Sequence, residues 1–371
     1  MPHRRYLGNY MTTDFSNYST NEQIIQRARV NLAQGPWDYL TGASESETTQ
    51  RRNRLAFDKI AFRPRVLIDV REIDTSTEFI GHRLRMPVLL APIGSLQVFH
   101  PEGGAVVSET AGEFDVMHVV SSVTSPSMEE TMAASNFAKA FQLYIHGDWE
   151  WTKDMIQRAV TAGYKGLCIT VDTAHYSRRE RPMLSKWTPV SRRNPADPQW
   201  QASVTWETIE KIKSYVDIPL MLKGIATVED AELAVDHGVD VVWVSNHGGR
   251  QLDHGLGTLD MLPEIAQVVG DKAEIILDGG IQRGSDVVKA VALGATAVAV
   301  GKLQGWGISA GGKNGLTRVL EILEEEIRIT MGLLGVTGIA QINEKYVCNA
   351  DPVTDPHEMS AWVNKPVDRI L

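Results

Sequence analysis

The stretch whose residue types are best suited to catalysis is residues 242–253, with the sequence VWVSNHGGRQLD. Its first half is apolar and β-branched, as in a buried strand, and it breaks at a glycine pair. His247 lies directly before that pair and Arg250 directly after it. An imidazole can take a proton near neutral pH, and a guanidinium can hold a carboxylate through two parallel hydrogen bonds. A base beside a carboxylate clamp suits proton removal from a small organic acid, although a His-Gly-Gly run is also a common loop.

Three further charged residues follow apolar runs. Lys223 closes one such run, where it either contacts a substrate or an anion that develops on a cofactor, or extends to solvent. Asp172 follows another run and can orient His247 and raise its basicity. Arg179 belongs to the charged run 178–181, which is either a solvated loop or the source of a second carboxylate contact.

Polar groups with a less specific signal follow the strand predicted near residue 140. Gln142 can donate to and accept from the amide edge of a heterocycle, and Tyr144 can hydrogen-bond a hydroxyl group. Tyr39, in the N-terminal region, is by pattern alone a packing residue.

Two glycine-bearing loops indicate a phosphate site. Residues 278–284 read DGGIQRG and precede a predicted helix, and Gly301-Lys302 ends the next predicted strand. Glycines expose backbone N–H groups that can bind phosphate, although they also simply permit tight turns. The nearby cations Lys302 and Arg283 favour a phosphate-bearing cofactor.

Apolar strand candidates alternate with helical stretches along most of the chain. Eight strands of this kind, each followed by a helix, predict a (β/α)8 TIM barrel, and polar residues at the strand ends mark its active face. The strands are expected at 87–91, 117–121, 140–143, 166–171, 220–222, 241–245, 274–277 and 297–300. The helices are expected at 103–114, 127–134, 151–162, 206–215, 228–237, 260–269 and 285–293.

The 371 residues are expected to form a single domain. Residues 1–80 form an N-terminal helical cap with helices from about 21, 36 and 50, residues 81–348 form the barrel, and residues 349–371 form a C-terminal arm. The segment 180–205, rich in Pro, Arg, Ser and Trp, exceeds ordinary loop length and is a candidate lid.

Composition and the absence of certain sequence motifs argue against several functional classes. A net charge of −9 without a basic stripe argues against nucleic-acid binding. No apolar run is long enough to cross a bilayer, and no metal-ligand spacing or dinucleotide fingerprint occurs. Cys168 lies in an apolar run, which favours a buried free thiol and a cytoplasmic protein.

Residues 245–253, SNHGGRQLD, resemble the signature of the FMN-dependent L-2-hydroxy acid oxidases and dehydrogenases, which include glycolate oxidase, lactate oxidase and mandelate dehydrogenase. The resemblance runs from about residue 22 to 348, and motifs match in order at seven of the eight strand ends. It implies an FMN cofactor, a small 2-hydroxy acid substrate oxidised to the 2-oxo acid with FMN N5 as hydride acceptor, and a homotetramer.

The resemblance also implies residue roles. His247 is the base that removes the hydroxyl or α-carbon proton, with Asp172 as its partner. Arg250 and Arg179, helped by Tyr39, bind the substrate carboxylate.

Other implied roles concern the substrate hydroxyl and the flavin. Tyr144 hydrogen-bonds the substrate hydroxyl, and Lys223 stabilises the anionic reduced flavin. The residues implied to contact the flavin ring are Pro92, Ile93, Gly94, Ser121, Gln142, Thr170 and Ser245. The residues implied to hold the ribityl chain and phosphate are Asp278, Gly279, Gly280, Arg283, Gly301 and Lys302.

The chain departs from the family pattern at several positions. Lys302 and Gln282 stand where arginine is common, which predicts weaker or different FMN binding, because lysine lacks the bidentate fork. Val123 replaces a tryptophan near the substrate and Gly94 replaces an alanine, so both enlarge the pocket. The loop after the fourth strand is short, which predicts an open site, and it lacks the apolar insertion of membrane-bound relatives. A substrate bulkier than glycolate or lactate is therefore expected.

Two alternatives belong to other functional classes. One is an FMN barrel enzyme without net redox change, of the type 2 isopentenyl diphosphate isomerase kind, which would not need the histidine and arginine clamp. The other is a flavin-binding protein without turnover, for which the set of His247, Arg250, Asp172 and Lys223 would have no use.

Overall fold

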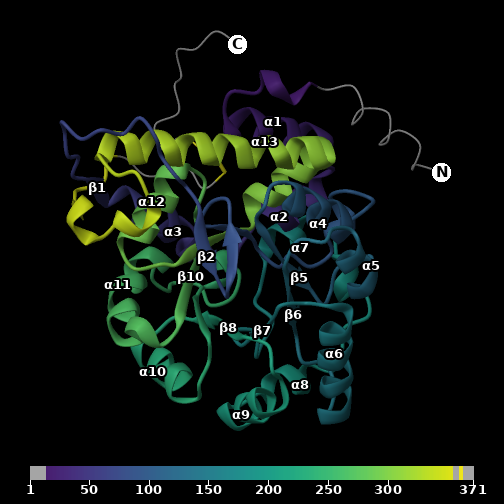
Figure 1. Cartoon of the computed structure of the whole chain (residues 1–371). Coiled ribbons are helices and arrows are strands. Elements are labelled where there is room, and N and C mark those ends of the chain that lie inside the picture. The colour runs from purple at the N-terminus through teal and green to yellow at the C-terminus, as the bar shows by residue number, and fades with distance from the viewer. Residues whose placement is uncertain (1–13, 354–358, 362–371) are drawn as a thin grey trace.

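The computed structural model describes residues 14–353 and 359–361, and eight parallel strands form a closed barrel at its centre (Figure 1). The strands run in the order β10-β11-β4-β5-β6-β7-β8-β9, and β9 pairs with β10 to close the ring. The strands are β4 (Val88–Leu90), β5 (Met117–Ser121), β6 (Lys139–Leu143), β7 (Gly166–Thr170), β8 (Leu220–Ile225), β9 (Val241–Val244), β10 (Glu274–Asp278) and β11 (Ala297–Val300). The predicted TIM barrel and its eight strands are confirmed.

The barrel strands are buried on both faces, which explains their continuous apolar sequences. One set of their side chains, including Leu89, Val119 and Trp243, packs inside the barrel, and the other set packs outward against the helices. Cys168 belongs to the inner set and is a buried free thiol, as predicted.

The seven bounded helix predictions are confirmed within two residues at each end. These helices are α4 (Gly104–Glu113), α5 (Met128–Ala133), α6 (Trp149–Ala162), α9 (Trp206–Tyr215), α10 (Val228–Asp236), α11 (Thr258–Val269) and α12 (Gly284–Ala292). The helix after the eighth strand, α13 (Lys302–Leu334), had no predicted bounds. Several glycines obscure its pattern, and its backbone is kinked at Gly311 and Gly312.

Three helices form the N-terminal cap, as predicted: α1 (Asn21–Asn31), α2 (Gln34–Thr41) and α3 (Thr48–Asp58). Thr20 and Gln23 form a reciprocal capping box that fixes the start of α1. Helix α1 lies along α13, and Asn31 donates hydrogen bonds from Nδ2 to two carbonyl groups of that helix (Figure 1). The cap is thereby anchored to the last helix of the barrel.

The hairpin of β2 (Thr77–Phe79) and β3 (His82–Leu84) closes the N-terminal end of the barrel. Phe79 and Leu84 are fully buried and pack in the same cluster as the inner barrel side chains. The expected cap boundary at residue 80 falls within this hairpin, so the cap and barrel are not separated there.

The candidate lid segment contains α7 (Glu180–Leu184), the 3-10 turn η3 (Val190–Arg192) and α8 (Pro198–Ala202). At the boundary between the predicted barrel and C-terminal arm, β12 (Val347–Asn349) pairs with β1 (Ile60–Phe62). Within the arm, Ser360 donates a hydrogen bond to Glu22. Residues 1–13, 354–358 and 362–371 of the expected cap and arm lie outside the described residues.

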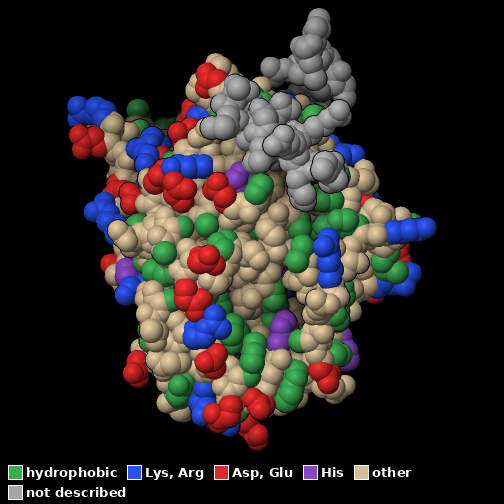
Figure 2. All heavy atoms as spheres, turned by 90° about the vertical axis from the view of Figure 1, so that its right-hand side faces the viewer, with side chains coloured by type: hydrophobic (Ala, Val, Ile, Leu, Met, Phe, Trp, Pro, Cys, Tyr) green, Lys and Arg blue, Asp and Glu red, His purple; other side chains and the backbone are tan. Residues whose placement is uncertain are grey.

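Two global expectations concern the surface. No helix among the described residues is long and apolar enough to cross a membrane. On the face in Figure 2, acidic and basic side chains are interspersed. This mixture of charges differs from the basic stripe that a nucleic-acid footprint requires.

Candidate active site

A cavity of about 800 Å³ lies at the carboxyl end of the barrel strands, a volume within the usual range for ligand pockets. Because the strands are parallel, the residues that follow them meet at this one end. The predicted site residues that line the cavity are Tyr39, Pro92, Ile93, Gly94, Val123, Tyr144, Arg179, Lys223, His247, Arg250, Asp278, Gly279, Gly280, Gly301 and Lys302. Residues more than 260 positions apart in sequence thus share one site.

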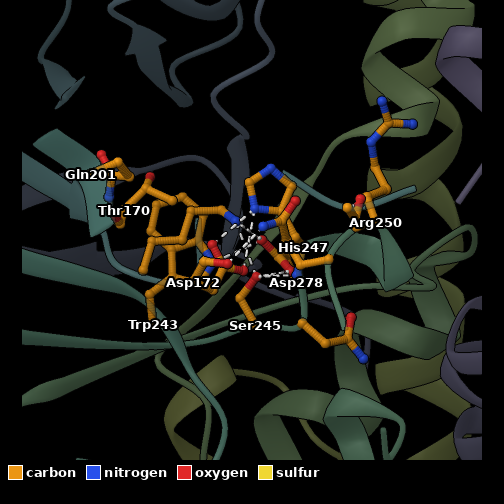
Figure 3. Close-up of polar contacts among 12 residues, drawn as sticks. Thr170, Asp172, Gln201, Trp243, Ser245, His247, Arg250 and Asp278 are labelled. Atoms are coloured by element: carbon orange, nitrogen blue, oxygen red, sulfur yellow. Dashed lines mark hydrogen bonds and ion pairs between the residues drawn. The ribbon is translucent and has the colours of Figure 1, made fainter. Parts of the chain in front are cut away.

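His247 and Asp172 form a hydrogen-bonded pair. His247 Nδ1 lies 3.0 Å from Asp172 Oδ1 and 3.2 Å from Oδ2 (Figure 3). With Nδ1 donating to the carboxylate, the lone pair of the neutral imidazole is on Nε2. His247 has a φ of 58°, in the left-handed region that few non-glycine residues adopt. Strain of this kind often marks functional positions.

Burial and the neighbouring Lys223 ammonium keep the His247 imidazole neutral. Burial lowers the pKa of His247 below its ordinary value, and the Lys223 ammonium lowers it further, while Asp172 partly opposes both. Burial would raise the pKa of Asp172, but His247 and Lys223 outweigh it and leave that pKa lowered. At neutral pH the pair is therefore an ionised carboxylate and an uncharged base.

Lys223 is the centre of a buried network next to His247. Its Nζ donates to Ser245 Oγ at 3.0 Å and lies 3.3 Å from Asp278 Oδ2, while Ser245 Oγ donates to Asp278 Oδ1 at 2.7 Å (Figure 3). Trp243 Nε1 donates to the same carboxylate. Burial would lower the pKa of Lys223, but Asp278 and Asp172 raise it, so the ammonium stays charged.

Two guanidinium groups lie in the same cavity. Arg250 donates to the carbonyl oxygens of Tyr39 at 2.6 Å and Gly42 at 2.7 Å, and Arg179 donates to Gln251 Oε1 at 3.0 Å. Burial and the neighbouring Arg179 lower the pKa of Arg250 to about 10, which leaves it protonated at neutral pH. Among the described residues neither guanidinium forms an ion pair with a carboxylate.

Two tyrosines border the same space. Tyr39 donates to the carbonyl oxygen of Gly94 at 3.1 Å, and its ring lies beneath the Arg250 guanidinium. Burial raises the pKa of both Tyr39 and Tyr144. Both phenols therefore remain protonated hydrogen-bond donors.

Gly94 and Val123, the two positions expected to enlarge the pocket, face each other. A Cβ atom on Gly94 would lie 2.9 Å from Val123 Cγ2, 3.6 Å from the Tyr39 hydroxyl oxygen and 3.8 Å from Ser191 Oγ. The first distance is too short for carbon atoms, so an alanine at 94 would require Val123 to move. The two departures from the family pattern therefore shape one wall.

Polar side chains at the ends of β5, β6 and β7 test whether the site fits a flavin. Both side-chain amide atoms of Gln142 and the hydroxyl oxygen of Thr170 are buried without hydrogen-bond partners among the described residues. Buried polar atoms normally have partners, so these await a ligand with donors and acceptors, as the amide edge of a flavin has. Ser121, at the end of β5, is also buried and accepts a weak bond from the Val123 amide at 3.4 Å.

The part of the cavity beside Gly280 and Gly301, where the FMN phosphate is expected, also fits that group. Helix α13 begins at Lys302, and Gly301 before it lines the cavity, so the positive end of the helix dipole faces this region. Gly280 has a φ of 87°, and a Cβ atom there would lie 2.8 Å from the Asn53 carbonyl oxygen. Only glycine permits this close approach.

The expected role of the Arg283 side chain is not supported by its position. Arg283 forms an ion pair with Glu326 at 2.7 Å and donates to the Ala361 carbonyl, and it does not line the cavity. The Glu326 carboxylate on α13 holds the guanidinium away from the cavity, which sequence spacing could not reveal.

The cap supplies cavity residues that the sequence analysis missed. Gln50, Asn53 and Arg54 of α3 line the cavity beside the two glycine loops. Gln50 accepts a hydrogen bond from Lys302, and Arg54 forms a buried ion pair with Asp286 at 2.7 Å. Their spacing of three and four residues, which places them on one helix face, is the signal that could have found them.

The segment 180–205 also contributes residues that were not predicted individually. Trp187 packs against the Tyr39 ring, and Gln201 donates to the Thr170 carbonyl at 2.9 Å. Ser191 and Ser95 exchange two hydrogen bonds at 2.9 and 3.0 Å. The segment thus forms part of the cavity wall, and the expectation that a short loop leaves the site open stays a prediction.

Comparisons with known proteins agree with this geometry. The family model of the FMN-dependent dehydrogenases matches residues 28–349. The chain is 37% identical over 349 residues to an L-lactate oxidase of Nostoc sp., covering 87% of this chain and 96% of the relative. It is 36% identical over 342 residues to 2-hydroxyacid oxidase 2 of Bos taurus, with coverage of 87% and 96%. A solved structure of mandelate oxidase superposes with a TM-score of 0.85 at 35% identity, covering 91% of this chain and all of that one.

The fold and the family match together place the chain among the flavin-dependent oxidoreductases. The chain belongs to the FMN-dependent dehydrogenase family, and FMN is its cofactor. The resemblance seen in residues 245–253 is thereby confirmed, and the alternative of an unrelated FMN isomerase is set aside.

Proposed function

We propose that the protein oxidises an L-2-hydroxy acid to the corresponding 2-oxo acid at this cavity. One observation carries the proposal: an uncharged imidazole oriented by a carboxylate faces the same cavity as two guanidinium groups that have no carboxylate partner among the described residues. When bound, FMN supplies the electron-pair acceptor at N5, with oxygen or another acceptor restoring its oxidised form. The names of the related lactate and mandelate oxidases support this reaction.

In the proposed reaction, Arg250 and Arg179 bind the substrate carboxylate, helped by the Tyr39 hydroxyl. His247 takes the hydroxyl or α-carbon proton on Nε2, and Asp172 stabilises the imidazolium that forms. Tyr144 donates a hydrogen bond to the substrate oxygen. The support is their common location in the cavity and the protonation states given above.

Cofactor binding is proposed for three groups of residues. Lys223 would offset negative charge that develops on the flavin, because its ammonium is held charged in a buried site. The residues proposed to contact the flavin ring are Pro92, Ile93, Gly94, Ser121, Gln142, Thr170 and Ser245. The residues proposed to hold the ribityl chain and phosphate are Asp278, Gly279, Gly280, Gly301 and Lys302, together with Gln50 and Arg54 from α3.

The proposed substrate is bulkier than glycolate or lactate. Gly94 and Val123 share one wall, and Val123 already packs where an alanine side chain at 94 would lie. The room proposed for a larger ligand is therefore that of the tryptophan which the family pattern has in place of Val123. We also propose a single domain that acts as a homotetramer in the cytoplasm, on the strength of the family resemblance and the contacts between cap and barrel. Light scattering of the purified protein tests the tetramer.

Replacing His247 by alanine tests the proposed base. The variant should retain FMN and its yellow colour, because the imidazole is proposed to act on substrate, but anaerobic addition of a 2-hydroxy acid should no longer bleach the flavin. The measurement is flavin absorbance over a series of 2-hydroxy acids of graded size. His254→Ala, which removes an exposed imidazole in the next loop, is the matched control and should bleach normally. Rapid bleaching of His247→Ala would refute the assignment.

A further inference from the structure

One arginine of the cavity, Arg192, has no part in the reaction or in the cofactor binding proposed above. Arg192 belongs to η3 in the segment 180–205 and lines the cavity. Its guanidinium carbon lies 3.2 Å from the centre of the Tyr176 ring, and no carboxylate lies within ion-pair distance of it among the described residues. Burial lowers the pKa of Arg192, and Arg179 lowers it further. A partly buried cation without a counter-charge is costly unless a ligand supplies one.

The charges of the cavity indicate that this ligand is the substrate. Lys223 is paired with Asp278, and Asp172 is paired with His247. Asp197 also lies at the cavity, but it is exposed and its carboxylate caps α8 by accepting from Gln199 N at 2.9 Å. A single carboxylate bound between the other two guanidinium groups leaves Arg192 uncompensated.

Arg192 lies close to the proposed binding site of the substrate carboxylate. Both Arg192 and Arg179 contact the Tyr176 ring, at 3.2 and 4.5 Å, so one aromatic ring spans the distance between them. Ser191, the neighbour of Arg192 in η3, also lines the cavity, and its Oγ would lie 3.8 Å from a Cβ atom on Gly94. A substrate whose carboxylate is held by Arg179 can therefore reach Arg192 with its other end, within the same cavity.

We propose that Arg192 forms a second anion site, and that the substrate is a short 2-hydroxy acid carrying a further anionic group at its other end. This inference rests on the proposed function and narrows its substrate class. The shared chemistry is a terminal oxyanion, which either a carboxylate or a phosphate-like group supplies. A guanidinium binds both through paired charge-assisted hydrogen bonds.

The test compares acids that differ in the terminal group alone. Anaerobic flavin reduction is measured with (S)-malate against (S)-2-hydroxyvalerate, with (S)-2-hydroxyglutarate against (S)-2-hydroxyhexanoate, and with the phosphonate analogue of malate. The purified FMN-loaded protein should prefer at least one dianionic acid over its neutral counterpart by about tenfold or more in kcat/KM. The better of the carboxylate and phosphonate arms identifies the terminal group.

Variants separate recognition of charge from a role in folding. Arg192→Gln should abolish the preference for the dianionic acid, and Arg192→Lys should restore part of it, because only the charge is common to arginine and lysine. Arg193→Gln, which removes the exposed neighbouring guanidinium, is the matched control and should keep the preference. FMN content and absorbance of each variant establish that it is folded.

Two results would overturn the inference. One is turnover of neutral acids with no preference for any dianionic acid, which leaves the proposed function intact. The other is an equal loss on both classes of acid in Arg192→Gln, as expected if Arg192 only supports the wall. If no 2-hydroxy acid bleaches the flavin, the proposed function itself fails, and the inference fails with it.

Discussion

Three features of His247 bear on its proposed role as the base. It is oriented by Asp172, its imidazole is kept uncharged by burial and by Lys223, and its backbone is held in the left-handed region. The backbone amide of His247 donates to Ser245 Oγ at 3.0 Å, which connects the base to the lysine network. The position of the base is thus fixed from both the side chain and the backbone.

The pH dependence of kcat/KM should reflect this environment. Because only the neutral imidazole accepts a proton and burial lowers its pKa below the ordinary value, activity should be fully present above the ordinary pKa of histidine and fall as the pH drops through the lowered pKa. In Asp172→Asn the acid limb should move to still lower pH, since the carboxylate raises the pKa of His247, and the plateau should fall because a weaker base remains. Stopped-flow flavin reduction is measured between pH 4.5 and 8 in steps of about half a pH unit, and it gives the acid limb and the plateau for both proteins. An acid limb centred above pH 6.5 would contradict the assignment of the base.

At the scale of elements, the phosphate end is assembled from three parts of the chain. The loop after β10 supplies glycines, α13 supplies its N-terminus and Lys302, and α3 of the cap supplies Gln50 and Arg54. Asp286 accepts from the backbone amides of Gln282 and Arg283, so its carboxylate already occupies the N-terminus of α12. The N-terminus of α13 is therefore the better site for a phosphate.

Lys302→Ala should weaken FMN binding by about tenfold to a hundredfold, the usual loss for one charge-assisted hydrogen bond. Retention of FMN on desalting, followed by titration of the apoprotein, measures the change. Arg283→Ala should leave the affinity for FMN unchanged, because Glu326 pairs with this side chain outside the cavity. The reverse order of affinities would show that Arg283 rather than Lys302 contacts the phosphate.

At the scale of the whole molecule, closure of the barrel brings the site residues together and the hairpin β2–β3 closes its opposite end. Phe79 and Leu84 fill the N-terminal end, where Gly166 leaves room for Met221 and Ile80. This end contributes packing, while the chemistry is at the other end.

Phe79→Ala should lower the free energy of unfolding by about 3 to 5 kcal/mol, because it leaves a cavity among fully buried side chains. Denaturant titration of the FMN-free protein measures the loss, and flavin reduction by substrate at low temperature should persist. Leu333→Ala, at a residue on α13 that is 72% exposed, should change stability by less than about 0.5 kcal/mol. Equal stability of the two variants would mean that the hairpin does not support the barrel.

Prediction from sequence succeeded where the information is local. The strands were located because each is a short apolar run buried on both faces, and the start of α1 was located by the Thr20 and Gln23 capping box. It failed to bound α13, whose glycines pack against Leu40, Phe15 and other distant residues instead of ending the helix. The ion pair of Arg283 with Glu326 was not foreseen for a similar reason, since the two residues are distant in sequence.

The sequence by itself determined the barrel, the family and the identity of the residues at the strand ends, because these depend on apolar runs and on motifs within a few positions. Only the tertiary structure decided which of those residues share the cavity, that α3 completes its phosphate end, and that Gly94 faces Val123. The physical reason is that these contacts join segments far apart in the chain, and their distances are set by the closure and packing of the barrel.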